Sequence, residues 1–350
     1  MNQKKHMGLA AIGMIVLAGM LVIGSRYTKE TLSVTPMERT DFLLNTFVNI
    51  KIYDSTDSAV LDEAFAICRD YEALLSRTIE GSEINQINHR DSSTEHIVLS
   101  DETACLMEKA LDYCTLSDGA FDITIEPASS LWDFTSETPK IPDEAELKAA
   151  VQKINYKNLH LEDRTLTVLS PDTRIDLGAI AKGYIADKIK EYLLSQNVQS
   201  AIINLGGNVL CIGNRPNGEP FRIGLQKPFA EREETFATVN ASDLSVVTSG
   251  VYERHFIIND TNYHHILNPK TGYPYDNGLI SVTILSKDSV DGDGFSTTCF
   301  SLGLEKGMEL INSLDGIYGC FIDTNYNVYY SDGMEDYLWK DKKKLWGNGI

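Results

Sequence analysis

The chain has 350 residues, 43% of them hydrophobic and 23% charged, which is the composition of a folded globular protein. Its 50 acidic residues outnumber its 31 basic ones, and the net charge of −19 excludes a nucleic-acid-binding protein, which needs a basic surface. None of the six cysteines forms a C-x-x-C pair, so the sequence lacks the usual zinc and thiol-redox motifs.

The first 30 residues predict a membrane segment. An uncharged stretch of 18 apolar or small residues runs from Met7 to Gly24. That length is close to the minimum for a membrane span and long for the core of a cleaved signal peptide. Lys4 and Lys5 precede it and should stay in the cytoplasm, which puts the rest of the chain outside. We therefore expect a cell-membrane anchor at 1–30 and a linker at 31–39, with signal cleavage and secretion as the alternative.

Strand and helix patterns are interspersed along residues 40–335. In chain order, the patterns predict a strand at 45–53, helices at 59–76, 101–116 and 144–154, a hairpin at 159–169, a strand, glycine turn and helix at 175–194, a buried strand at 201–207, several short strands, helices near 294–313 and a hairpin near 318–331. The many hairpin-like pairs favour a single α+β domain, with a mixed, largely antiparallel sheet and flanking helices. A C-terminal tail is expected at 336–350.

Two stretches predict a site for a phosphate and a cation. DLGAIAKGYIAD (176–187) predicts a glycine turn that opens a helix, where free N–H groups and the charge of Lys182 suit a phosphate. DGDGFSTTCF (291–300) places Asp293 and Thr297 four residues apart, hence on one face of a helical turn. Carboxylate and hydroxyl oxygens are hard ligands that suit Mg²⁺. The alternatives are a surface lysine and a helix cap by Asp293.

Four further stretches contribute candidate residues. They are GAFDITIEPASSLW (119–132), INLGGN (203–208), TSGVYERHF (248–256) and HHILNPKTGYP (264–274). Asp122 lies in an apolar run and could equally cap a turn, and the glycine pair of INLGGN admits a ligand or makes a tight turn. His264 and His265 would point to opposite faces of a strand, so at most one of them faces a site. Taken together, these stretches indicate Mg²⁺-assisted phosphoryl-type transfer.

In this order and spacing the motifs resemble those of the ApbE family, the FAD:protein FMN transferases. The resemblance covers roughly residues 40–335. The motifs that carry it are SRTIEGSEINQIN (76–88), GAFDITIEP (119–127), IDLGAIAKGYIAD (175–187), INLGGN (203–208), TSGVYER (248–254), HHILNPKTGYP (264–274) and GDGFSTTCF (292–300). Family members are exported and often anchored to a membrane, which agrees with the predicted N-terminal segment.

The resemblance implies an enzyme that binds FAD and Mg²⁺ and transfers FMN to a Thr or Ser hydroxyl of a partner protein, releasing AMP. The implied acceptor is a respiratory membrane subunit or an extracytosolic flavoprotein with a D-G-x-T-[AG]-[AT]-like sequence. Asp293, Thr297 and the Ala179 carbonyl match the metal-ligand positions. The positions implied to contact FAD are Thr78, Ala120, Phe121, Asp122, Lys182, Ser249, His265 and Ile266. Thr78 departs from the aromatic residue that some members have there.

The acceptor hydroxyl is a weak nucleophile that benefits from a base near neutral pH. His265 has a suitable reference pKa and is the expected base, with Asp293 as the alternative. An FAD pyrophosphatase, in which water replaces the acceptor hydroxyl, and a non-catalytic exported FAD-binding protein are the other functions that the sequence leaves open.

Overall fold

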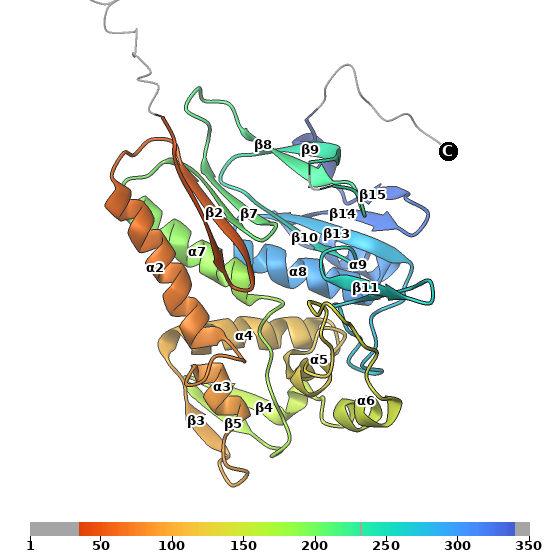
Figure 1. Cartoon of the computed structure of the whole chain (residues 1–350). Coiled ribbons are helices and arrows are strands. Elements are labelled where there is room, and N and C mark those ends of the chain that lie inside the picture. The colour runs from red at the N-terminus through yellow and green to blue at the C-terminus, as the bar shows by residue number, and fades with distance from the viewer. Residues whose placement is uncertain (1–34, 232, 340–350) are drawn as a thin grey trace, which may run out of the picture. The chain divides into compact units, whose positions relative to one another are not determined.

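A computed structural model describes residues 35–231 and 233–339. An eight-stranded sheet, in the order β1-β2-β6-β7-β10-β13-β14-β15, forms its centre (Figure 1), and every neighbouring pair is antiparallel. Its strands are β1 (Met37–Leu43), β2 (Thr46–Ile52), β6 (Ser200–Leu205), β7 (Asn208–Gly213), β10 (Ser245–Gly250), β13 (Leu279–Ser286), β14 (Tyr318–Asp323) and β15 (Val328–Tyr330). The prediction of an α+β domain with a largely antiparallel sheet is confirmed.

Helices cover one face of this sheet. They are α2 (Ser58–Leu75), α7 (Ala181–Ser195), α8 (Ser289–Leu302) and α9 (Leu304–Asn312). The apolar side of α2 packs with α7 against β2, β6 and β7 in one hydrophobic cluster. The strand β13 is buried at all of its positions, because Val282 and Ile284 pack with the α8 side while Leu285 packs with β8 (Phe221–Gln226) and β9 (Thr235–Ala241) on the other side.

A second, mostly helical layer lies beyond α8 (Figure 1). It contains α3 (Glu83–Asn88), α4 (Asp101–Leu116), α5 (Glu126–Ser129), α6 (Glu144–Val151), the 3-10 helices η1 (Ile123–Ile125) and η2 (Tyr156–Asn158), and the small sheet of β3 (His96–Val98), β5 (Thr165–Val168) and β4 (Leu159–Glu162). The hairpin of β11 (His255–Ile258) and β12 (Thr261–His264) follows β10 in the chain, and η3 (Met334–Tyr337) lies near the end of the described residues.

The strand expected at the start of 175–194 is absent from the described residues. Asn88 takes the place of a neighbouring strand, because its Oδ1 accepts from the Ile175 N–H at 2.6 Å and its Nδ2 donates to the Ile175 carbonyl at 2.8 Å. The Asp176 N–H donates to the Ile123 carbonyl at 2.8 Å. The backbone is therefore satisfied by a side chain and a turn, and it stays extended without joining a sheet.

Two predicted boundaries need correction. The linker predicted at 31–39 overlaps β1, because Met37–Leu43 pairs along its whole length with β2. The tail predicted at 336–350 begins inside η3, and Leu338 still bridges to Val239 of β9. The membrane segment predicted at 1–30 lies outside the described residues. Within 35–231 and 233–339, no helix has the length and apolarity that a membrane span requires.

All six cysteines are described, and all are free thiols. Cys105 of α4 is exposed, whereas the other five are buried: Cys68, Cys114, Cys211, Cys299 and Cys320. Burial raises the pKa of each buried thiol above its usual range. A raised pKa keeps a thiol protonated and unreactive, so these five residues act as small apolar core side chains.

Candidate active site

The junction of α7 and α8 brings together the two predicted phosphate- and cation-binding motifs. Lys182 Nζ lies 3.6 Å from Asp293 Oδ1, and the Gly183 N–H donates to Asp293 Oδ2 at 2.9 Å. Asp293 is only 4% exposed, and its burial raises its pKa, while the charge of Lys182 and the Gly183 N–H oppose that rise. The carboxyl group is therefore buried and oriented, and the first turn of the neighbouring helix holds it.

Gly183 lets the two helices come this close. A Cβ built on Gly183 would lie 2.3 Å from the carbonyl oxygen of Ser289, so only glycine fits at this crossing. Asp187, one turn further along α7, accepts from the N–H groups of Ser289 and Val290, each at 2.8 Å. One motif thus supplies both the close contact and the cap of α8, because a carboxylate satisfies the free N–H groups of a helix start. The sequence did not reveal these roles of Gly183 and Asp187.

The predicted helix cap by Asp293 is not what the structure shows. Asp293 lies inside α8, and its side chain accepts from Gly183 of α7, whereas Asp187 caps α8. Thr297 follows one turn later, and its Oγ1 lies 3.1 Å from Ser249 Oγ. Ser249 also lies 2.9 Å from Ser296 Oγ, so the end of β10 is joined to α8 by a row of hydroxyls.

The donors in this junction fit a hard divalent cation. Asp293 offers a carboxylate, Thr297 a hydroxyl, and Ala179 a carbonyl to which no hydrogen-bond donor is found in the described part of the chain. The Gly183 N–H, which would reach that carbonyl in a continuous helix, donates to Asp293 instead. Oxygen donors of these types are those that Mg²⁺ prefers.

The histidine pair divides as predicted. His264 is 4% exposed, its Nδ1 accepts from the Ile266 N–H at 3.3 Å, and its Nε2 lies 3.0 Å from the Tyr275 carbonyl. The two contacts require a neutral ring with its proton on Nε2, and burial lowers the pKa of His264 to about 4. His265 is exposed, and its N–H donates to the Arg254 carbonyl at 3.1 Å. Only His265 is available to a ligand in solvent.

The surroundings of His265 favour its neutral form. Although the side chain is open to solvent, desolvation by the surrounding protein, and then the positive charge of Arg254, lower the pKa of His265. The turn that follows is rigid, because the Asn268 N–H donates to the Tyr273 carbonyl and the Gly272 N–H to the Asn268 carbonyl, each at 2.8 Å. A neutral imidazole can accept a proton, so the local geometry is compatible with a general base.

Tyr275, which the sequence did not single out, connects the segment 120–122 to His264. The Tyr275 hydroxyl donates to the Ala120 carbonyl at 2.9 Å, and the Tyr275 carbonyl contacts His264. Phe121 is 4% exposed and Ile266 is 5% exposed, so both side chains belong to the core and only their backbones could face a ligand.

Asp122 holds the loop in place. Its Oδ1 accepts from the Thr124 N–H at 2.8 Å and from the Thr124 hydroxyl at 2.6 Å, while its Oδ2 accepts from the Tyr156 N–H at 3.0 Å. Asp122 is the N-cap of η1, so the structure shows the turn-capping role that the sequence offered as the alternative to a ligand contact.

Thr78 is exposed beside a charged network. Its Oγ1 lies 3.2 Å from Ser76 Oγ. The preceding residue, Arg77, lies 3.1 Å from Asp176 Oδ2 and 3.6 Å from Glu126 Oε1. Asp176 begins the turn that carries Ala179 and Lys182, so Arg77 connects the Thr78 segment to that turn. No local pattern reveals the ion pair of Arg77 and Asp176, because the two residues are about a hundred positions apart.

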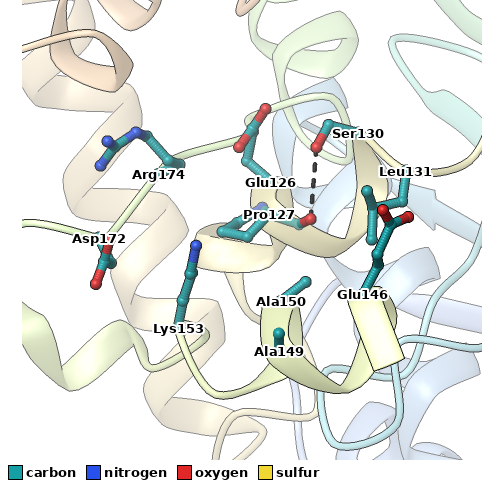
Figure 2. Close-up of a pocket in the computed structure, with 10 residues that line it drawn as sticks. All are labelled: Glu126, Pro127, Ser130, Leu131, Glu146, Ala149, Ala150, Lys153, Asp172 and Arg174. Carbon is teal, nitrogen blue, oxygen red and sulfur yellow. Dashed lines mark hydrogen bonds between the residues drawn. The ribbon is translucent and has the colours of Figure 1, made fainter. Parts of the chain in front are cut away.

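A separate hollow of about 410 Å³ lies between α5, α6 and the extended segment before α7 (Figure 2). Charged heads of both signs surround it, and Ala149 and Ala150 of α6 contribute small apolar surfaces. Its lining residues are Glu126, Pro127, Ser130, Leu131, Glu146, Ala149, Ala150, Lys153, Asp172 and Arg174. None of the predicted site residues is among them.

Comparisons with known proteins agree with the motifs. The ApbE family model matches residues 44–322. An FAD:protein FMN transferase of Klebsiella pneumoniae (strain 342) is 36% identical over 291 residues, which cover 83% of this chain and 90% of the relative. One of Treponema pallidum (strain Nichols) is 30% identical over 317 residues, covering 85% and 87%. The solved flavin transferase ApbE from Vibrio cholerae has a TM-score of 0.78 at 26% identity and covers 87% of this chain and 99% of that chain.

Proposed function

The chain belongs to the ApbE family and is a transferase of that family, and we propose that it uses Mg²⁺ to move FMN from FAD onto an acceptor protein. The acceptor is a Thr or Ser hydroxyl, the product is a phosphoester of FMN, and AMP leaves. In this step the acceptor oxygen bonds to the FMN phosphorus as the bond from that phosphorus to the AMP oxygen breaks, and the acceptor proton goes to a base.

One observation carries this proposal. Lys182 and Gly183 of α7 contact Asp293 of α8. Thr297 follows Asp293 one turn later in α8, and Ala179 lies three residues before Lys182. Ala179, Asp293 and Thr297 would hold the cation, which when bound supplies neutralisation of the charge on the pyrophosphate. Lys182 and the N-terminal end of α7 would hold the same pyrophosphate, because both present positive charge to it.

His265 is proposed as the base. Its ring is exposed and neutral, so a ring nitrogen can accept a proton, and the turn that ends at Pro274 fixes its backbone. The lowered pKa makes the ring a weaker base than a free histidine. A neutral ring nitrogen takes the proton of the acceptor hydroxyl as that oxygen attacks. Asp293 is a poorer base, because its carboxylate already accepts from Gly183 and faces Lys182.

The location of the catalytic domain is also a proposal. We place it outside the cytoplasm behind an N-terminal membrane anchor, with a respiratory membrane subunit or an extracytosolic flavoprotein carrying a D-G-x-T-[AG]-[AT]-like sequence as the acceptor. The apolar stretch from Met7 to Gly24 and the lysines before it support this arrangement.

The test incubates the full-length chain with FAD, Mg²⁺ and an acceptor protein that carries the threonine sequence. We expect the acceptor to gain the mass of one FMN and AMP to appear in equal amount. FAD cleaved to FMN and AMP beside an unmodified acceptor would favour a pyrophosphatase instead. FAD that is bound and remains intact in Mg²⁺ would leave only a binding protein. An acceptor whose threonine is replaced by alanine is the control.

A further inference from the structure

Asn208, the first residue of β7, is a buried polar side chain at the α7–α8 junction that the proposed function leaves unused. It is 2% exposed, and its Oδ1 accepts a hydrogen bond from Ser289 Oγ at 2.6 Å. Its Nδ2 has no hydrogen-bond partner in the part of the chain that the structure describes. A buried donor without a partner costs about 1–3 kcal/mol, so its retention calls for a reason.

The direction of this amide follows from its neighbours. Ser245 Oγ donates to Ser289 Oγ at 2.9 Å, which leaves the Ser289 hydroxyl proton for Asn208. A donating hydroxyl requires the carbonyl oxygen of the amide, so Oδ1 faces Ser289 and Nδ2 faces away from it. The row of hydroxyl and amide groups therefore fixes the side chain of Asn208 in one orientation.

The group beside that amide is Asp293. Ser289 and Asp293 are four residues apart in α8 and share one face of the helix, so a side chain bonded to Ser289 lies next to Asp293. The Asn208 amide is close enough to stabilise the charged form of the Asp293 carboxylate, although its Nδ2 is not within ordinary hydrogen-bond geometry of it. Lys182, Gly183 and Asn208 thus all present positive ends to one carboxylate.

Building on the proposed function, we propose that Asn208 is a positioning residue of the cation site, whose fixed amide orients the Asp293 carboxylate without adding charge. The Gly183 N–H holds one oxygen of Asp293, and the amide presents its positive end to the carboxylate from the side of the sheet. Partners of this kind orient a metal ligand, and their loss costs about 10–100-fold in metal affinity. Cation binding would then be the reason why the chain keeps a buried amide that lowers its stability.

The first test replaces Asn208 by leucine, which has nearly the same shape and no amide. Mn²⁺ is titrated into the full-length chain, and free Mn²⁺ is read by electron paramagnetic resonance, independently of turnover. We expect the Kd of Asn208→Leu for Mn²⁺ to rise about 10-fold or more. Ser200→Ala is the matched control, because it removes the side-chain hydrogen bond of a buried serine at the far end of the same β6–β7 hairpin and leaves the row around Asn208 intact. Its Kd should stay within about twofold of wild type.

A second variant tests the inference in case Asn208→Leu does not fold, which would show as the loss of a cooperative melting transition. Asn208→Asp puts a second carboxylate beside Asp293, so we expect a lower Tm in EDTA and a larger rise in Tm on adding Mn²⁺ than in wild type. Asn204→Asp is the control on the same hairpin. Asn208 pairs with Leu205, so the neighbouring Asn204 points to the other face of the sheet.

The outcomes separate this inference from the proposed function. Wild type that binds Mn²⁺, with Asn208→Leu within twofold of it, would overturn the positioning role and leave the cation site standing. Equal Mn²⁺-induced rises in Tm for Asn208→Asp and Asn204→Asp would overturn it as well. Wild type that binds no Mn²⁺ would refute both the inference and the Mg²⁺ dependence of the proposed function.

Discussion

Gly183→Ala sets two opposing effects against each other in α7. Alanine in place of glycine inside a helix stabilises it by about 1 kcal/mol. The new Cβ would lie 2.3 Å from the Ser289 carbonyl oxygen and 2.7 Å from Val290 Cα, and both of these are backbone atoms that cannot rotate away. Overpacking of this kind costs about 1–3 kcal/mol or more. We expect the steric term to win, with a net loss of about 1–2 kcal/mol in the free energy of unfolding.

The same substitution should cost more in activity than in stability. Relief of the clash needs a shift of about 1 Å between α7 and α8, because ordinary contact begins near 3.4 Å. That shift separates Lys182 and Ala179 from Asp293 and Thr297, and a misplacement of this size costs about 100-fold in rate.

Urea unfolding of the full-length chain and the kcat/KM of FMN transfer measure the two effects. Ser195→Ala, at the exposed end of the same helix, is the control for helix propensity and should change neither quantity by much. A Gly183→Ala protein that is more stable than wild type and fully active would show that the helices do not pack as described.

Three further predictions concern single side chains. Asp293→Ala should abolish Mg²⁺-dependent turnover and weaken Mn²⁺ binding, and full activity of this variant would refute the cation assignment. If His265 takes the acceptor's proton, His265→Gln should lower the rate of transfer by about 100- to 10,000-fold while FAD binding, read by flavin fluorescence, changes little; a loss of FAD affinity instead would make it a binding residue. Burial raises the pKa of Asp187 from 3.8 to about 6, so the folded protein holds this proton more tightly than the unfolded chain. This stabilisation is present below about pH 4 and is lost as the pH rises through about 6, which lowers the free energy of unfolding by roughly 3 kcal/mol in all. Urea unfolding of Asp187→Asn should therefore show a shallower pH dependence than that of wild type.

Local periodicity accounts for what the sequence predicted well. The spacing of Asp293 and Thr297 places both on one turn of α8, because helix geometry fixes residues four apart. The alternation of a strand assigned opposite surroundings to His264 and His265, and their exposure agrees. The sequence predicted the hairpins and the long helices for the same reason, since residues within one short segment determine each of them.

Contacts between segments that are distant in the sequence explain the features that the sequence did not predict. Asn88 holds Ile175 across 87 residues, so a segment with the composition of a strand never joins a sheet. Asp187 caps α8 from more than a hundred residues away, and no pattern near Asp293 shows that the cap is already supplied. Tyr275 and Asn208 matter through partners that only the folded chain brings to them.

The distribution of the cysteines provides a readout of folding that needs no engineering. In the native protein a maleimide should reach only Cys105, because the other thiols are buried and their raised pKa values keep them protonated. The buried thiols lie in three parts of the core, with Cys68 in one, Cys114 and Cys299 in a second, and Cys211 and Cys320 in a third. Each thiol becomes reactive only when its part of the core opens. Mass spectrometry after brief alkylation would therefore count one adduct on the folded chain and six on the unfolded chain. Peptide mapping of partly alkylated chains would identify the segment that opens first.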